Sequence, residues 1–484
     1  MKRKMLFLVA FAVVAMLAFA ACGGNDDNGG GGGGGGATAD TPATTDGGGG
    51  GAASTDDGAG AATDNIIELR VLNYIDLTGA GATEEVAVIW DAFEAAHPHI
   101  RLIREDEFDE SFHHAIEAYA AAGMLPDVMY AWPSGRSTTL HENRLLLDLM
   151  PLVQRDGLYN YLIPAVLDPS AQAGGYLAII PQGITATNTF FVNMEVLDAV
   201  GLQPARTYSE MVAQVPILAE AGFETLLMAN EATWVMQSCL FSLVAGRFMG
   251  EGWDERILSG QTTFEDPGFI AALAFIQQMY QDGVISPTTL MVDYGLAPGL
   301  FATNTAAYYI DGDWRVGAFI TDSATGEALI SPERQENFYV TVFPEIDLPG
   351  VVIPGRTNSV VLGVGWGINA ELANDPERLE AAWTLVRWLI GEEVQSFRLR
   401  TGGLPNPSWA GIDADALPLE PLQVSLAGLG SEFDIATVVF DGSFPGVVYS
   451  PLNDGLQALG MGTTTPEAVA AIVQAAFEAW LDVQ

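Results

Sequence analysis

Residues 66–73, IIELRVLN, open an alternation of strand and helix signals that decides the fold class. This short apolar run predicts a buried strand, and further strands are predicted over 100–103 and 127–130. A helix over 83–97 follows from apolar residues that recur on one side of a 3.6-residue turn, and a second helix is predicted over 109–122. The order strand-helix-strand-helix-strand predicts an α/β protein whose mostly parallel sheets are flanked by helices.

The part of the chain from residue 65 onward is too long for one comfortable hydrophobic core. Its length predicts two lobes of roughly 200 residues each. Further helices begin at capping residues that precede a proline, namely Asp266, Asp375 and Thr465. We find no internal repeat.

The chain is strongly acidic, and its basic residues are almost all arginine. It has 61 Asp and Glu against 19 Lys and Arg, a formal net charge of −42, and no lysine follows Lys4. A surface of this charge repels phosphate backbones, so we expect no nucleic-acid partner. The lack of lysine also excludes a Schiff-base enzyme, a pyridoxal-phosphate anchor and a phosphate-binding P-loop. We interpret the charge as adaptation to a salty or acidic habitat.

The N-terminus has the features of an exported lipoprotein. Basic residues at 2–4 precede a short apolar run that ends in small residues, which predicts a secretory signal peptide over 1–21. The segment LAFAACG at 17–23 resembles the bacterial lipobox, in which the cysteine, here Cys22, becomes the lipidated first residue. Residues 22–64 contain no Leu, Ile or aromatic residue, so we expect a disordered tether. The protein is thus predicted to lie outside the cytoplasm on a lipid anchor; the alternative, a longer N-terminal membrane helix, is disfavoured by the short run.

Several segments, in this order and spacing, resemble one family of bacterial proteins. They are MLPDV with Tyr130 and Trp132 (124–132), the region 176–181, TFFVN (189–193), the motif that ends in Asp313-Trp314 (301–314), GWGI (365–368) and GGLP (402–405). Together they resemble the extracellular solute-binding proteins of ABC importers, specifically the maltose-binding-protein-like sugar family (family 1).

This resemblance implies a two-lobed periplasmic-binding-protein-like fold of type II, with a hinge and a cleft between the lobes. The chain would cross between lobes near 185–188, near 363–366 and after 405. The N-terminal lobe would comprise 65–185 plus 366–405, and the C-terminal lobe 188–363 plus 406–484.

The resemblance also implies a function without catalysis. A carbohydrate, which we expect to be an oligosaccharide, would bind in the cleft and pass to a membrane permease driven by a separate ATPase. We expect a monomer with no cofactor, and contact with the membrane through the lipid anchor alone.

A sugar site needs flat aromatic rings for the C–H face and polar groups for the hydroxyl rim. Trp314 occupies the stacking position of the family motif, and Trp132 and Trp366 stand in loop-like contexts. Trp90, Trp383 and Trp480 are predicted to be core residues from their helical spacing, and Trp253 and Trp409 are expected to pack between elements. The predicted ligand-binding residues are Trp314, Trp132, Trp366, Asp76, Asp109, Asp313, Trp234 and Arg136.

The remaining motifs point to no metal and leave other functions open. His97 and His99, and the adjacent His113 and His114, lack the spacing of a zinc site, and the acidic run 105–110 lacks the spacing of an EF-hand. Cys239 is expected to be a small buried hydrophobe. The alternatives that remain are a binding protein for a polyamine, glycerol phosphate or peptide, a surface glycosidase, and an adhesin.

Overall fold

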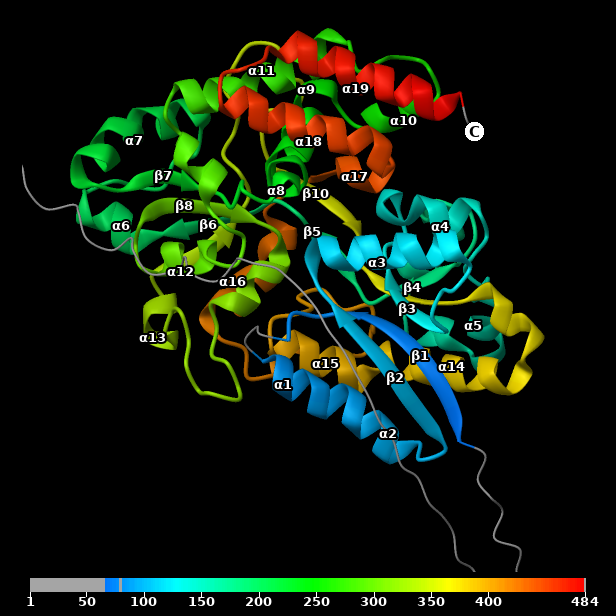
Figure 1. Cartoon of the computed structure of the whole chain (residues 1–484). Coiled ribbons are helices and arrows are strands. Elements are labelled where there is room, and N and C mark those ends of the chain that lie inside the picture. Colours follow the sequence, from blue (N-terminus) through cyan, green and yellow to red (C-terminus); the bar gives the residue numbers. More distant parts are fainter. Residues whose placement is uncertain (1–65, 78–80, 483–484) are drawn as a thin grey trace, which may run out of the picture. The chain divides into compact units, whose positions relative to one another are not determined.

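The computed structural model describes residues 66–77 and 81–482 (Figure 1). The predicted signal peptide (1–21), the lipidated Cys22 and the tether (22–64) lie outside the described residues. Within the described part, none of the helices has the length and apolar character needed to cross a membrane.

A five-stranded sheet has the order β2-β1-β3-β11-β4. Parallel pairs join β1 to β2 and β1 to β3, whereas β11 runs antiparallel to both β3 and β4. The three strands predicted for the start of the body are all present, although β2 continues to Glu107 instead of ending at 103. It lies at the sheet edge, where its backbone pairs with β1 and where Arg104 and Asp106 form an ion pair at 2.8 Å. The strands are β1 (Ile67–Tyr74), β2 (Ile100–Glu107), β3 (Val128–Ala131), β4 (Ile179–Pro181) and β11 (Gly365–Ile368).

A four-stranded sheet has the order β7-β8-β6-β9. Here β7 and β8 are parallel, while β6 is antiparallel to β8 and β9. All strands but one in each sheet therefore run the same way, as the predicted mostly parallel arrangement requires. The reversed strands, β11 and β6, are the ones that enter from the other sheet. The strands are β6 (Thr189–Asn193), β7 (Glu224–Leu227), β8 (Ala306–Asp311) and β9 (Phe338–Thr341).

The chain passes between these sheets through β5 (Ile184–Ala186) and β10 (Thr357–Leu362), which form a three-stranded sheet with β12 (Ile435–Thr437). β5 joins β4 to β6, and β10 joins β9 to β11, and the two passages pair antiparallel. Next to them, the Asn188 and Asn358 side chains exchange hydrogen bonds with the backbone of the opposite passage. These paired passages have the geometry of a hinge. The lobe boundaries predicted from the sequence, 65–185 plus 366–405 and 188–363 plus 406–484, stay a prediction.

Helices cover both faces of the sheets. Figure 1 shows α14, α1 and α2 on one face of the five-stranded sheet, with α3 and α4 on the other. The helices are α1 (Ala82–Glu85), α2 (Ala92–Ala96), α3 (Asp109–Ala122), α4 (Thr138–Glu142), α5 (Met150–Asp156), α6 (Met194–Ala199), α7 (Tyr208–Ala221), α8 (Thr233–Met236), α9 (Ser242–Met249), α10 (Trp253–Leu258), α11 (Pro267–Gln281), α12 (Ala297–Ala302), α13 (Pro332–Gln335), α14 (Pro376–Leu389), α15 (Glu392–Arg400), α16 (Pro421–Ala427), α17 (Phe440–Ser443), α18 (Gly446–Gly460) and α19 (Pro466–Leu481).

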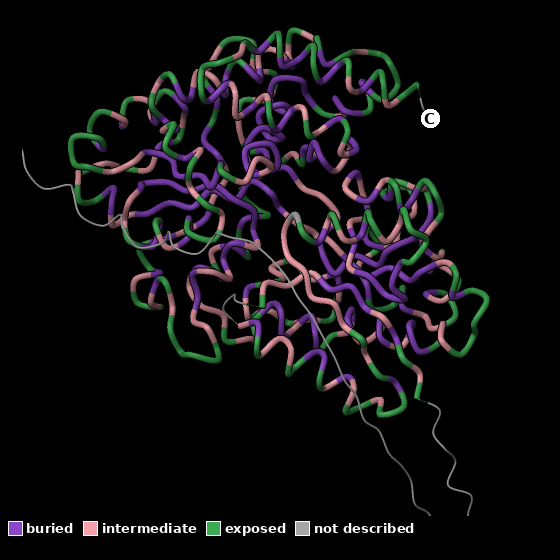
Figure 2. The backbone as a smooth tube through the Cα atoms, in the orientation of Figure 1, coloured by how far each residue is buried: buried purple, intermediate pink, exposed green. Residues whose placement is uncertain are grey.

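The sheets carry the hydrophobic core, as the buried backbone in Figure 2 shows. In β6, Phe190 packs into one apolar cluster and Phe191 into another, so this strand is buried on both faces. The predicted core residues Trp90 and Trp383 are buried, and so is Cys239. Trp480 is partly buried.

One arginine is fully buried and holds three segments together. Arg247 of α9 donates to Thr357 Oγ1 at 2.9 Å and to the carbonyl oxygens of Phe343 at 2.8 Å and Pro344 at 2.5 Å. Burial lowers its pKa to about 9. The guanidinium thus ties β10, one of the two hinge passages, to α9 and to the segment after β9.

We expect Arg247→Met to lower the free energy of unfolding by about 2 kcal/mol, because three buried acceptors lose their donor while a desolvated charge is removed. Urea denaturation measures this loss. The matched control is Arg206→Met, since the Arg206 side chain is 85% exposed and its removal should change little. Equal effects of the two substitutions would contradict this structural role.

Candidate ligand-binding cavity

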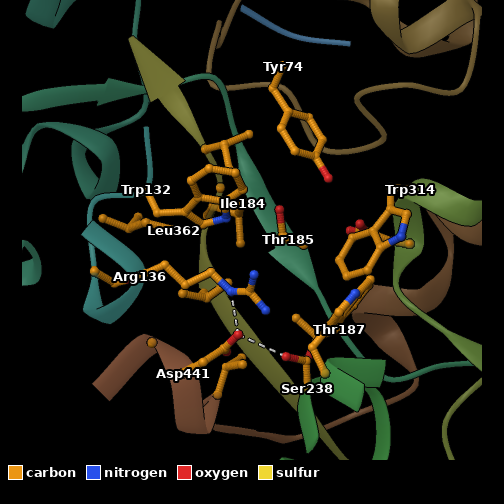
Figure 3. A pocket seen from close by; sticks show the side chains of 18 of the residues that line it. Tyr74, Trp132, Arg136, Ile184, Thr185, Thr187, Ser238, Trp314, Leu362 and Asp441 are labelled. Carbon is orange, nitrogen blue, oxygen red and sulfur yellow. Dashed lines mark hydrogen bonds and ion pairs between the residues drawn. The ribbon is translucent and has the colours of Figure 1, made fainter. Parts of the chain in front are cut away.

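A cavity of about 380 Å³ lies where the five-stranded and four-stranded sheets meet the hinge passages (Figure 3). It is lined by residues that follow strands of both sheets and by β5 and β10 themselves. Its volume is in the range of small-molecule sites. The cavity is therefore positioned to bring ligand into contact with both sheets at once.

One side of the cavity is a cluster of aromatic rings, here called the first wall, made of Tyr74, Tyr130 and Trp132. Tyr74 ends β1, Tyr130 lies in β3, and Trp132 follows β3, so all three stand at the carboxyl ends of neighbouring parallel strands. The Tyr74 and Tyr130 rings stack with centroids 5.5 Å apart, and Trp132 meets each of them edge-on at 5.6 Å. Mutual packing fixes the orientation of this wall.

The second wall comprises Trp234, Tyr294 and Trp314, which come from elements around the four-stranded sheet. The Trp234 centroid lies 5.0 Å from that of Tyr294 and 6.2 Å from that of Trp314. Trp314 Nε1 donates to Tyr294 Oη at 2.7 Å. The Trp314 ring also lies against Gly312, where an added Cβ would come within 2.1 Å of it, so only glycine leaves room for the ring.

Between the walls, the hinge passages supply Ile184, Thr185, Val361 and Leu362 to the cavity lining. Figure 3 shows Thr185 between Trp132 on one side and Trp314 on the other. The lining here is apolar apart from threonine hydroxyls. A ligand held between the walls would contact the very strands that join the two sheets.

An ion pair bridges the two sides at one end of the cavity. Arg136, in the turn after β3, lies with its Nε 2.6 Å from Asp441 Oδ2 of α17, and the same oxygen accepts from Ser238 Oγ at 3.0 Å (Figure 3). Both side chains are largely buried, at 13% and 8% exposure. His113 Nε2 lies 3.3 Å from Arg136, and burial together with this charge lowers the pKa of His113 to about 4.

A second buried cation also has its own carboxylate. Arg315 Nε donates to Asp311 Oδ2 at 2.9 Å, and Tyr309 Oη donates to the same oxygen at 2.5 Å. The Arg315 guanidinium lies 3.7 Å from the centroid of the Tyr294 ring, so it supports the second wall from behind. The two arginines of the cavity lining are thus both neutralised by aspartates of the protein.

Asp313 lines the cavity and is almost fully buried. Its Oδ2 accepts from the Ala186 backbone N–H and from Asn406 Nδ2, both at 2.9 Å. Burial nevertheless raises the pKa of Asp313 to about 7. The carboxyl group of Asp313 therefore changes charge near neutral pH. Its two hydrogen bonds link the end of β5 to the segment after α15.

Six of the eight predicted ligand-binding residues line this cavity, and two do not. Trp314, Trp132, Trp234, Asp109, Asp313 and Arg136 all contribute to its lining. Trp366 was predicted to bind ligand, and this prediction is wrong. It lies in β11, fully buried, with Trp90 5.6 Å and Tyr130 5.2 Å away between centroids, so it supports the first wall from the core. Asp76 follows β1 and is not part of this lining, so its contact with ligand stays a prediction.

Four further residues line the cavity and were not predicted from the sequence: Tyr74, Tyr130, Tyr294 and Asp441. A signal was present for Tyr74 and Tyr130, because each lies at the end of a predicted strand, where α/β folds bind ligands. No local signal marked Tyr294 or Asp441. In the described parts of the chain, no three His, Cys, Asp or Glu side chains gather as ligands for a metal ion.

The pKa of Asp313 predicts a pH dependence that Asp313→Asn should remove. Because burial raises the pKa from its ordinary value of 3.8 to about 7, the folded state resists ionisation, and the stability contribution of this group is lost as pH rises from about 4 to 7. As pH rises from 4 to 8, the melting temperature of Asp313→Asn should therefore increase relative to that of wild type.

His113→Gln supplies a control of opposite sign. Because the pKa of His113 is lowered, its contribution to the stability of the folded state is lost as pH falls from 6.5 toward 4. The melting temperature of His113→Gln should therefore increase relative to that of wild type as pH falls. Parallel pH profiles for Asp313→Asn and wild type would contradict the assignment to Asp313.

Comparison with solved structures identifies the fold. The chain is similar to a protein from a study of xylan utilization by the thermophilic bacterium Caldanaerobius polysaccharolyticus (TM-score 0.72, 20% identity, 84% of this chain and 99% of that one). It is also similar to a chitin oligosaccharide binding protein (TM-score 0.72, 19% identity, 86% and 99%) and to maltose-bound MalE3 of T. maritima (TM-score 0.67, 19% identity, 85% and 99%). The protein therefore has the two-lobed type II periplasmic-binding-protein-like fold.

No curated protein matches the chain at the level of sequence. The family described as bacterial extracellular solute-binding protein, in contrast, matches residues 89–416, more than half of the chain. Members of this family act outside the cytoplasm as the binding components of ABC importers. The chain belongs to the bacterial extracellular solute-binding proteins.

Proposed function

We propose that this protein captures a neutral carbohydrate between its two aromatic walls and delivers it to an ABC permease. The observation that carries the proposal is the pair of walls on opposite sides of one cavity, since aromatic faces suit the C–H faces of sugar rings. Solved relatives include proteins whose names refer to chitin oligosaccharide and maltose, which supports the same ligand class.

The charges of the cavity favour a neutral ligand over an anion. Arg136 and Arg315 each have an aspartate of the protein as partner, at 2.6 and 2.9 Å. A phosphate ester would have to replace one of these partners, and the displaced carboxylate would then lie beside it. This arrangement argues against glycerol phosphate as the ligand.

The same contacts favour binding over hydrolysis. Glycoside hydrolysis uses two carboxyl groups that act on the glycosidic bond. Of the three aspartates that line this cavity, Asp441 is engaged by Arg136 and Ser238, and Asp313 by Ala186 and Asn406. The third, Asp109, would supply only one of the two carboxyl groups that the reaction needs. We therefore propose a receptor, with turnover of chromogenic glycosides as the result that would support a glycosidase instead.

Capture would proceed by closure about the hinge passages. A ligand that contacts both walls binds the closed form more tightly than the open form and so shifts the population toward closure. In this proposal the lobes are 65–185 plus 366–405 and 188–363 plus 406–484, and a lipid on Cys22 holds the protein, as a monomer, near its permease.

A thermal-shift screen of the full-length protein tests the proposed function. The screen compares mono- and oligosaccharides with polyamines, phosphate esters and short peptides at matched ionic strength. We expect at least one sugar to raise the melting temperature through its binding to the folded state. A shift with polyamines, phosphate esters or peptides and none with sugars would overturn the proposal, and no shift with any compound would favour the adhesin.

A further inference from the structure

We infer that the cavity selects pyranose rings whose hydroxyls are all equatorial, as in glucose and xylose, over their axial epimers. This inference rests on the proposed carbohydrate function and specifies its stereochemistry. It is carried by the positions of the aromatic and polar groups around the cavity.

The two walls come from different sheets and lie on opposite sides of the cavity. Trp132 belongs to the first wall and Trp314 to the second, and Figure 3 shows them across from each other with Thr185 between. A ring bound between them has one face toward each wall. Both faces of the sugar therefore meet aromatic carbon.

Each wall is fixed before a ligand arrives. Tyr74, Tyr130 and Trp132 pack against one another at 5.5 to 5.6 Å between centroids. On the other side, Trp314 is held by its hydrogen bond to Tyr294 Oη at 2.7 Å. Neither wall can turn its rings aside for a polar substituent without losing these contacts.

Several of the polar groups that line the cavity lie around the edge of the space between the walls. The Arg136–Asp441 pair and Ser238 occupy one end, and Figure 3 shows the Tyr74 hydroxyl directed into the cavity from the other side. Thr185 lies on the hinge passage between the walls. Hydroxyls that lie near the plane of a sugar ring point toward this edge.

The stereochemical preference follows from these positions. In an all-equatorial pyranose, every hydroxyl lies near the ring plane and both faces present only C–H groups. An axial hydroxyl, as at C4 of galactose or C2 of mannose, stands on one face and would be pressed against an aromatic ring. There it loses water without gaining an equivalent hydrogen bond, which is unfavourable.

Titration calorimetry with matched epimers tests the inference on the full-length protein. The ligands are xylotriose and cellotriose, against β-1,4-linked mannotriose, which differs from cellotriose only in the axial C2 hydroxyl of each ring. We expect xylotriose or cellotriose to bind about tenfold more tightly than mannotriose, equivalent to about 1.4 kcal/mol. Equal or tighter binding of an epimer overturns the inference and leaves the proposed function standing, whereas an absence of binding by every sugar overturns both.

Variants of the two walls test the sandwich itself. Trp132→Ala and Trp314→Ala should each weaken binding of the preferred trisaccharide at least fivefold. Each should also reduce the difference in affinity between this trisaccharide and its epimer. Trp480→Ala is the matched control, because Trp480 lies on α19 and does not line the cavity. If only one wall variant loses affinity while both remain folded by circular dichroism, the sugar has a single aromatic face and the inference fails.

Discussion

Trp314→Ala should weaken binding of the cognate sugar by about 1–3 kcal/mol, or roughly 5- to 150-fold in Kd. The indole is half-buried, packs near Trp234 and donates to Tyr294, so its removal takes away much of the second wall. Because Trp314 is not fully enclosed in the core, the fold should survive the substitution. Titration calorimetry gives the affinity, and circular dichroism reports the fold.

Gly312→Ala offers an independent route to the same outcome. The new methyl group would come within 2.1 Å of the Trp314 ring and must displace it. This variant should therefore lose affinity although the indole is retained, while Trp480→Ala keeps wild-type affinity. Unchanged affinity in Trp314→Ala would remove this residue from the site.

Asp441→Ala should weaken ligand binding by about 3 kcal/mol, because it leaves the Arg136 guanidinium without its carboxylate in a largely buried position. The pair spans the two sides of the cavity, from the turn at Gly135–Ser137 to α17, so its loss should weaken a ligand-bound state in which these two sides meet. Close packing reinforces this link, since an added Cβ on Gly135 would lie 2.5 Å from the Asp441 carbonyl oxygen.

A double-mutant cycle separates this coupling from direct contact with the ligand. The variants are Asp441→Ala, Arg136→Met and the two combined, each titrated with the same sugar. We expect the double variant to bind more tightly than Asp441→Ala alone, because it contains no unpaired buried charge. Strictly additive losses would mean that the two residues act on the ligand separately and that the pair does not control closure.

The fold could be predicted largely because local patterns agree with it. The strands that begin the body and the helices that start at Asp266, Asp375 and Thr465 follow from apolar periodicity and capping chemistry. Strand direction was harder to predict. β6 and β11 are antiparallel to their neighbours because the chain enters each sheet through a hinge passage, and no local pattern records that long-range path.

The candidate site could be predicted only in part, and the structure shows why. Trp314 and Asp313 follow a strand at the cavity, and the motif that contains them carries that information. Trp366 was misjudged because its glycine neighbours suggested a loop. Gly365 instead allows tight strand pairing, since a Cβ there would lie 2.1 Å from the Ile180 carbonyl oxygen. Asp441 meets Arg136 only through folding, 305 positions away along the chain.

A crystal structure of the protein with its tightest-binding sugar decides whether a ligand binds between the two aromatic walls. We expect electron density for a sugar ring between Trp132 and Trp314, with hydroxyls directed toward Arg136 and Thr185. Density for the sugar at any other place on the protein, with the space between the two indoles unfilled, would contradict it.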